Sequence, residues 1–175
     1  MKTTLKPRIH FIITGGTIDS VYDGSKDTVV PLKKSVIPTF MRTIRSADQF
    51  VFEQICMKDS RHLTPSDMEK ILASVQKSQY RYIIITHGTY TMPDTARFLK
   101  AKLGKTQKTI LFTGSMIPIY GFAPSDGTFN LGLACGVIEY INPGVYVAMN
   151  GRVFTPEEVL KSLYGGKFSS IFGER

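Results

Sequence analysis

The sequence predicts an α/β fold with a mainly parallel sheet and helices on both faces. Short runs rich in isoleucine, valine and aromatic residues recur along the chain, and amphipathic stretches of helix length separate them. This alternation is typical of parallel sheets, whose strands need helical crossover connections. The 175 residues contain no internal repeat and no low-complexity segment, so we expect one domain over residues 1–175.

Five strands and five helices are predicted along the chain. The strands are expected at residues 9–13, 51–56, 82–85, 109–112 and 145–149. Helices are expected over residues 36–44, after Thr64, after Thr91, from residues 125–127 onward, and from Pro156 to Lys161. The segments at Thr64 and Thr91 each join an N-cap threonine to a first-turn proline and an acidic residue. Gly104 and the Gly165-Gly166 pair are the predicted stops of the third and fifth helices.

Charge and hydropathy exclude several functional classes. The 22 Lys and Arg residues against 14 Asp and Glu residues give a net charge of +8, but the basic residues are spread thinly along the chain. There is no basic stripe interleaved with aromatic residues, so we do not expect nucleic acid as a partner. The apolar run over residues 82–85 is far short of the ~20 residues of a membrane span.

The N-terminus and the cysteines point to a cytoplasmic protein. Basic residues precede only the short run at residues 9–13, which His10 interrupts, so a signal peptide is not expected. Cys56 and Cys135 allow at most one disulfide and are expected to be plain core residues. The sequence has no dinucleotide fingerprint, no P-loop and no metal-binding histidine spacing, so neither a cofactor nor a metal is expected.

Polar side chains follow each predicted strand. Ligands of open parallel sheets bind beyond the carboxyl ends of the strands, so these loops are where a site is expected. The loops are residues 14–19, 58–61, 86–91 and 113–116, and Lys161 follows the last strand. Threonine and serine dominate them. Such a convergence suits catalysis by a hydroxyl nucleophile with a lysine in reach.

Each candidate also has a plain structural interpretation. Thr17 is the candidate nucleophile, with backbone amides near Gly16 as oxyanion donors, although glycines there also suit an ordinary turn. Thr89 follows a tight turn, where its hydroxyl can face the same edge. Lys161 can act as a base if burial and a positive field lower its pKa, whereas a surface lysine is the more common case.

Three motifs together resemble the signature segments of the bacterial asparaginase/glutaminase family. They are Thr14-Gly15-Gly16-Thr17-Ile18, then Thr86-His87-Gly88-Thr89-Tyr90-Thr91-Met92, then Thr113-Gly114-Ser115-Met116-Ile117-Pro118 with Ser125-Asp126-Gly127 and Asn130-Leu131. The match covers nearly the whole chain in the family's order and corresponds to the larger N-terminal domain of that family. It implies a flavodoxin-like, doubly wound fold and hydrolysis of the side-chain amide of L-asparagine, or a related small carboxamide, to the acid and ammonia.

The resemblance also implies roles for individual residues. Thr17 matches the threonine that attacks the amide and forms an acyl-enzyme, while Thr89 and Lys161 match the family's second threonine and its lysine. Asp59 and Ser60 match a pair that binds the amino acid part of the substrate. The further implied substrate-binding positions are Gly16, Gly88, Tyr90 and Ser115. The resemblance implies no cofactor. It implies a homodimer or a higher homo-oligomer.

Three departures from the family pattern affect these expectations. Tyr90 stands where the family has an aspartate that pairs with the substrate's α-amino group, so either Asp59 or Asp19 replaces it or the substrate lacks a free amine. Val29 stands where a loop tyrosine is usual, and Tyr22 is the candidate catalytic replacement. The 175 residues also end where the family's smaller C-terminal domain would begin, and that domain completes the site in tetrameric members.

Two alternatives follow from these departures. The first alternative is a protein that binds an amino acid or a related acid with little or no turnover. The second is an ammonia-producing or structural module of a larger assembly. A related domain occurs in archaeal amidotransferases that act on charged tRNA, which the net charge of +8 would suit.

Overall fold

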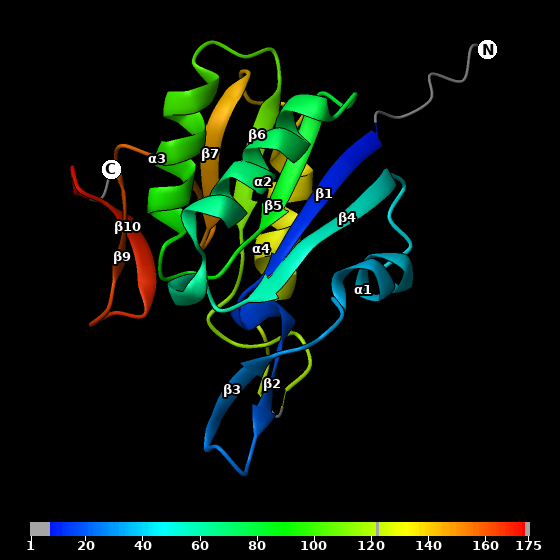
Figure 1. Ribbon diagram of the computed structural model, residues 1–175, viewed down its shortest axis with the longest axis vertical. Coiled ribbons are helices and arrows are strands. Elements are labelled where there is room, and N and C mark those ends of the chain that lie inside the picture. Colours follow the sequence, from blue (N-terminus) through cyan, green and yellow to red (C-terminus); the bar gives the residue numbers. More distant parts are fainter. Residues whose placement is uncertain (1–7, 122, 174–175) are drawn as a thin grey trace.

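A computed structural model describes residues 8–121 and 123–173 and contains a six-stranded central sheet (Figure 1). The strands of this sheet are β1 (Arg8–Gly15), β4 (Gln49–Lys58), β5 (Tyr82–Thr86), β6 (Thr109–Thr113), β7 (Gly144–Met149) and β8 (Arg152–Phe154). Their spatial order is β4-β1-β5-β6-β7-β8, with β8 antiparallel to β7 and the other neighbours parallel. The predicted α/β fold with a mainly parallel sheet is therefore confirmed, and each of the five predicted strands is present.

The strand order reverses at β1, which pairs in parallel with β4 on one side and β5 on the other. The chain winds outward from this strand in both directions, which makes the sheet doubly wound. The loops leaving β1 and β5 consequently diverge toward opposite faces. In folds of this kind, that divergence opens the crevice in which ligands bind.

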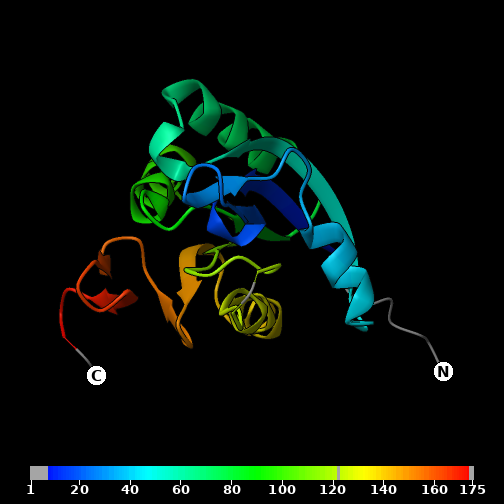
Figure 2. The same ribbon diagram turned by 90° about the horizontal axis from the view of Figure 1, so that it is seen from below.

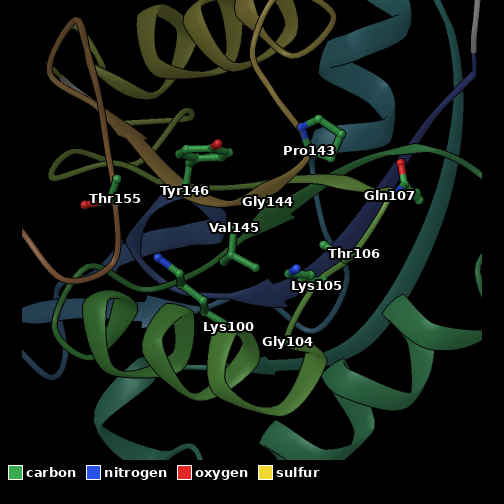
Figure 3. Close-up of a pocket in the computed structure, with 10 residues that line it drawn as sticks. All are labelled: Lys100, Gly104, Lys105, Thr106, Gln107, Pro143, Gly144, Val145, Tyr146 and Thr155. Atoms are coloured by element: carbon green, nitrogen blue, oxygen red, sulfur yellow. The ribbon is translucent and has the colours of Figure 1, made fainter.

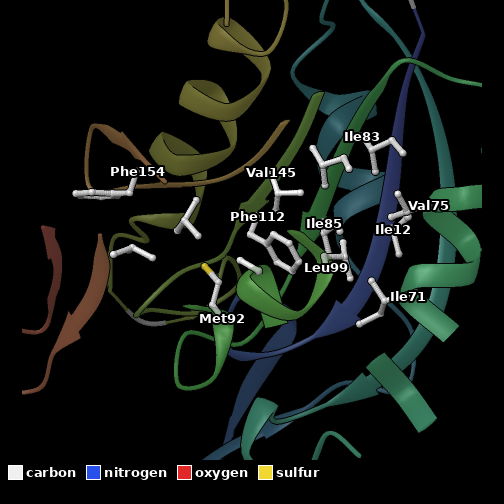
Figure 4. Close-up of a cluster of buried hydrophobic side chains, with 14 of the residues drawn as sticks. Ile12, Ile71, Val75, Ile83, Ile85, Met92, Leu99, Phe112, Val145 and Phe154 are labelled. Atoms are coloured by element: carbon white, nitrogen blue, oxygen red, sulfur yellow. The ribbon is translucent and has the colours of Figure 1, made fainter. Parts of the chain in front are cut away.

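Helices cover both faces of the sheet (Figure 2). They are α1 (Ile37–Thr43), α2 (Pro65–Lys77), α3 (Met92–Leu103) and α4 (Gly127–Val137). Side chains alternate along β1, so Ile12 packs with α2 and α3 while Phe11 and Ile13 pack with α1 and α4. Figure 4 shows the first of these clusters, in which Ile71 and Val75 of α2 lie beside the sheet. Within the described residues, no helix is long and apolar enough to cross a membrane.

The helix signals in the sequence are largely confirmed. The hydroxyl of Thr64 accepts the Asp67 amide at 3.2 Å, and the Asp67 carboxylate accepts the Thr64 amide at 2.9 Å, which completes a capping box at the start of α2. Gly104 ends α3 with a φ of 57°. Thr91 occupies the N-cap position of α3, but its hydroxyl donates to the Ser60 carbonyl at 3.0 Å and caps no helical amide.

The predicted helix from Pro156 to Lys161 is wrong. This segment forms a two-stranded antiparallel hairpin of β9 (Val159–Ser162) and β10 (Lys167–Ser170), and Gly165-Gly166 lies in its turn. Val159 and Phe168 are buried from opposite strands of the hairpin and join the core cluster beside α3. Burial of these alternating apolar residues outweighs the helix-start signal at Pro156, because tertiary packing routinely overrides local propensity.

A second hairpin, two short 3₁₀ helices and the cysteines also differ from expectation. A second hairpin, β2 (Ser20–Asp23) with β3 (Thr28–Pro31), follows the short 3₁₀ helix η1 (Thr17–Asp19), and another 3₁₀ helix, η2 (Ser60–His62), follows β4. Cys56 and Cys135 are both free, and each is half-buried rather than enclosed in the core.

Candidate functional site

A cavity of about 200 Å³ opens at the carboxyl edge of the sheet, where the strand order reverses. Its lining comes from the loops after β1, β4 and β5, with one residue each from β3 and β9. The lining residues are Gly16, Thr17, Val29, Asp59, Ser60, Arg61, Gly88, Thr89, Tyr90 and Lys161. The structure therefore brings together eight of the ten residues proposed from the sequence, and it adds Val29 and Arg61.

Glycines let three loops meet at the floor of this cavity. A Cβ on Gly16 would lie 2.4 Å from Gly88 Cα, and a Cβ on Gly88 would lie 2.7 Å from Ser60 Oγ. Gly16 also has a φ of 84°, which L side chains rarely adopt. The plain turn role is thus confirmed for Gly16, whose amide donates to the Lys58 carbonyl at 2.8 Å. That bond leaves the Gly16 amide unsuited to the expected role of oxyanion donor.

Hydroxyl groups join the same loops to one another. Thr14 Oγ1 donates to the Thr86 carbonyl at 2.9 Å, which ties the end of β1 to the end of β5. Ser60 is buried, and its hydroxyl accepts the Thr91 amide at 3.3 Å. The Thr91 hydroxyl returns a bond to the Ser60 carbonyl, so two hydrogen bonds hold the loop after β4 against the loop after β5.

Lys161 reaches the buried threonine of the β5 loop from the β9 strand. Its Nζ donates to Thr89 Oγ1 at 2.7 Å, although 72 residues separate the two in sequence. Burial is the main cause that lowers the pKa of Lys161 below its ordinary value, and the nearby positive charge of Arg61 adds to it, while Asp59 acts in the opposite direction. Both conditions set for a basic lysine, desolvation and a positive field, are present here.

His87 stabilises the turn before Thr89. Its Nδ1 donates to the Gly88 carbonyl at 2.7 Å, and its ring packs edge-on against Phe112. Complete burial lowers the pKa of His87 to about 4, so the ring is neutral at pH 7. His87 therefore has a structural role in the turn that carries Thr89.

The profile described as "Asparaginase, N-terminal" matches residues 8–164. The chain belongs to the asparaginase family. It is 31% identical over 160 residues to probable L-asparaginase 4 of Schizosaccharomyces pombe, covering 85% of this chain and 44% of that relative. It is 29% identical over 177 residues to a glutaminase-asparaginase of Acinetobacter glutaminasificans, covering 90% of this chain and 50% of that one.

Solved structures agree with this assignment. A probable cytoplasmic L-asparaginase from Campylobacter jejuni superposes with a TM-score of 0.77 at 30% identity, over 96% of this chain and 54% of that one. A thermostable L-asparaginase from Thermococcus kodakarensis superposes with a TM-score of 0.75 at 27% identity, over 94% and 51% of the two chains. The chain thus spans about half the length of these relatives, and the matched part is the N-terminal domain.

Two of the residues proposed for the asparaginase site lie outside the cavity lining. The hydroxyl of Tyr22 donates to Asp27 Oδ1 at 2.6 Å within the β2–β3 hairpin. Tyr22 is the cross-strand partner of Val29, so it stands one strand away from the residue that lines the cavity. Ser115 is buried and donates to the Ile117 carbonyl at 2.6 Å, which directs its hydroxyl into its own loop.

Asp19 is also placed away from the cavity, so it does not replace the family aspartate. It is fully buried, and its carboxylate accepts the Ser35 hydroxyl at 2.9 Å and the Val36 amide at 2.8 Å. Burial raises the pKa of Asp19, and these hydrogen bonds oppose the rise. Its role is to hold the start of α1 under η1.

The polar residues of the third motif are structural, which sequence reasoning did not show. The Asp126 carboxylate accepts the backbone amides of Met116 and Ile117 at 3.0 and 2.9 Å. Asn130 donates to the Gly114 carbonyl at 3.0 Å and accepts the Asn150 amide at 3.0 Å. These side chains hold the loops after β6 and β7 together beside the candidate site.

A larger cavity of about 530 Å³ lies at the other end of the sheet (Figure 3). It is formed between the end of α3, at Lys100 and Gly104, and the start of β7, at Gly144 and Val145. It contains none of the residues proposed from the sequence, and it lies at the amino ends of the strands. The smaller cavity is the candidate site because it lies at the carboxyl ends of the strands and holds the residues proposed from the sequence, although it is the smaller of the two. Among the described residues, no group of three or more His, Cys, Asp or Glu side chains is placed to hold a metal ion.

Proposed function

We propose that this chain is an amidohydrolase that hydrolyses the side-chain amide of L-asparagine, or a related small carboxamide, to the acid and ammonia. The observation that carries the proposal is the 2.7 Å bond from Lys161 Nζ to Thr89 Oγ1 in a cavity that Thr17 also lines. Hydrolysis through a hydroxyl nucleophile needs a base for the attacking water, and a lysine of lowered pKa beside a second hydroxyl supplies one. Membership of the asparaginase family supports this chemistry.

The proposed reaction has two steps. Thr17 Oγ attacks the amide carbon and forms an ester as the C–N bond breaks, and the hydroxyl proton leaves with the nitrogen as ammonia. Water then attacks the ester with Thr89 and Lys161 accepting its proton, and Thr17 regains its hydroxyl as the acid is released. Because the Gly16 amide is bonded to Lys58, we assign the oxyanion to the Thr17 amide instead.

Other lining residues bind the rest of the substrate in this proposal. Asp59 and Gly88 face the cavity from the loops after β4 and β5, and Tyr90 closes one side of it. Ser60 Oγ accepts the Thr91 amide, and its own O–H is left to donate to the substrate. We further propose a homo-oligomer and a cytoplasmic location, as expected from the sequence.

We favour turnover over binding alone. A protein that only binds an amino acid has no use for a lysine of lowered pKa held on a buried threonine. A structural module of a larger assembly likewise gives no reason for the contact between Lys161 and Thr89. The Lys161–Thr89 contact is therefore the observation that separates the first hypothesis from the other two.

A coupled ammonia assay over asparagine, glutamine and amine-blocked amides tests the proposal. Ammonia release should fall to background in Thr17→Ala and in Thr89→Ala, while circular dichroism shows a retained fold. Thr106→Ala is the matched control, because Thr106 lines the larger cavity at the opposite edge. Full activity in both site variants would reject the proposal.

A further inference from the structure

Three charged side chains line the candidate site, and two of them are cations. They are Asp59, Arg61 and Lys161. Arg61 already occupies the Asp59 carboxylate: Nε donates to Oδ1 at 3.0 Å, Nη2 donates to Oδ2 at 2.7 Å, and the Arg61 amide donates to Oδ1 at 2.8 Å. Of the lining residues, Asp59 is the single carboxylate, so the charge that a substrate ammonium would need is already paired with the Arg61 guanidinium.

Tyr90 brings the two cations to one place. Lys161 Nζ lies 4.7 Å from the centre of its ring and Arg61 Cζ lies 5.3 Å from it. The face of an aromatic ring attracts cations at these distances. It does not offer the charge-assisted hydrogen bonds that the two oxygens of a carboxylate give to an ammonium group. The ring thus gathers positive charge at the position where the family carries an aspartate.

The local charge disfavours one substrate group and favours another. An α-ammonium placed beside Tyr90 would stand next to two like charges, and the one lining carboxylate is already paired with Arg61. A carboxylate placed there would meet Lys161 and the guanidinium, which uses two of its five N–H groups on Asp59 and keeps the others for a ligand. Planar two-point recognition of carboxylates is the interaction for which arginine is best suited.

We propose that this site takes short carboxamides that bear a carboxylate but no free amino group, the monoamides of dicarboxylic acids, with Arg61 as the carboxylate-binding residue. The inference rests on the proposed amidohydrolase function for its chemistry, and on the cavity's own charges for its selectivity. The cavity of about 200 Å³ suits a four-carbon chain such as succinamate, which is asparagine without its amino group.

The first experiment compares kcat/KM for succinamate and asparagine. Succinamate should be preferred by about tenfold or more, the value of one charge-assisted hydrogen bond. Arg61→Gln should reduce kcat/KM for succinamate by about 10- to 100-fold, mainly through KM, and leave asparagine less affected. Tyr90→Asp should shift the preference toward asparagine. Arg42→Gln, a surface change on α1, is the matched control.

A binding experiment separates this inference from the proposed function. Calorimetry on the wild-type protein and on Thr17→Ala compares succinate with aspartate, and it needs no turnover. Tighter binding of succinate that Arg61→Gln abolishes would support the inference even if no amide released ammonia, in which case the proposed function alone falls. Equal or tighter binding of aspartate, or a preference for asparagine in the ammonia assay, would overturn the inference and leave the amidohydrolase proposal in place.

Discussion

The two walls of the candidate site are built differently. One wall, which we call the strand-loop wall, consists of Gly16, Ser60, Gly88 and Thr89, and all four are buried at the ends of sheet strands. The other, the hairpin wall, consists of Val29 on β3 and Lys161 on β9, which come from two hairpins outside the main sheet. Val29 is 41% exposed, and Leu163 and Tyr164 beyond Lys161 are more exposed still.

This difference separates two tasks. In the strand-loop wall, a Cβ added to Gly16 or Gly88 would lie only 2.4 to 2.9 Å from atoms of the neighbouring loops, so these two positions tolerate almost no change. The hairpin wall delivers the basic group to Thr89 on an element with fewer neighbours. Tight packing suits the positioning of reacting groups, and an element with few neighbours makes access for the substrate easier.

The largest expected effect comes from filling the strand-loop wall. Gly88→Ala would place a Cβ 2.7 Å from Ser60 Oγ and push the loops after β4 and β5 apart. We expect a loss of ammonia release of about 100-fold or more, since displacements near 1 Å cost this much in positioned sites. Gly132→Ala on α4, where a Cβ meets nothing within 4 Å, should keep full activity and gain helix stability. Comparable activity in the two variants would contradict the rigid-wall account.

The next effect concerns the basic group of the hairpin wall. Lys161→Met should lower kcat by about 100-fold or more, the usual contribution of a general base. Because burial lowers the pKa of Lys161, the neutral form gains population as pH rises, so wild-type kcat should increase with pH and level off below the ordinary lysine pKa. The variant should lose this ascending limb. Lys34→Met, an exposed lysine away from the cavity, should retain it.

The support beneath the strand-loop wall is expected to affect stability. Asp67 is desolvated, which opposes ionisation, but hydrogen bonds from Lys58 and Thr64 lower its pKa to about 2. Its contribution is therefore fully present above the unfolded pKa near 4 and is lost as pH falls toward 2. Asp67→Asn should cost about 2 kcal/mol in the free energy of unfolding at pH 7 and flatten its acid dependence.

An exposed acidic residue of another helix serves as the control for this prediction. Asp94 pairs with Arg97 at 2.9 Å on the surface of α3. Asp94→Asn should change the free energy of unfolding at pH 7 by less than about 0.5 kcal/mol. Urea unfolding of both variants at several pH values measures this free energy. Equal decreases in the two variants would show that the capping box does not support the wall as we describe.

The smallest effect is expected at Tyr22. Its hydroxyl is bonded to Asp27 and lies outside the cavity lining, so Tyr22→Phe should alter kcat/KM by less than about threefold, within the range of surface substitutions. A loss as large as that of Lys161→Met would show that the β2–β3 hairpin closes over the site and that Tyr22 assists Thr17, as the sequence analysis proposed.

The strand-loop wall was predictable from the sequence, and the hairpin wall was only partly so. Buried parallel strands have a strong pattern, and their carboxyl ends must meet at one edge, so Thr17, Asp59 and Thr89 could be placed together before any coordinates. Lys161 was proposed as a base from its place after the last strand, and the family resemblance gave it the same role. Its element was wrong, because the start signal at Pro156 is typical of a short helix.

Arg61 shows what pattern reasoning does not reach. It lies two residues after Asp59, and that spacing matches any surface turn. Its importance depends on the Tyr90 ring, which is distant in sequence and becomes its neighbour through the packing of the β4 and β5 loops. The anchoring roles of the half-buried Asp126 and the buried Asn130 were missed for a similar reason, since their partners are backbone groups, which a sequence does not distinguish.

The account's central claim is that Thr17 forms the covalent intermediate. The most direct measurement is mass spectrometry of acid-quenched Thr89→Val protein during turnover, because this change should slow the second step and let the acyl-enzyme accumulate. We predict a mass increase equal to the acyl group on the peptide that contains Thr17, and none in the Thr17→Ala, Thr89→Val double variant. An acyl group on another residue, or ammonia release with no acyl group at all, would contradict the claim.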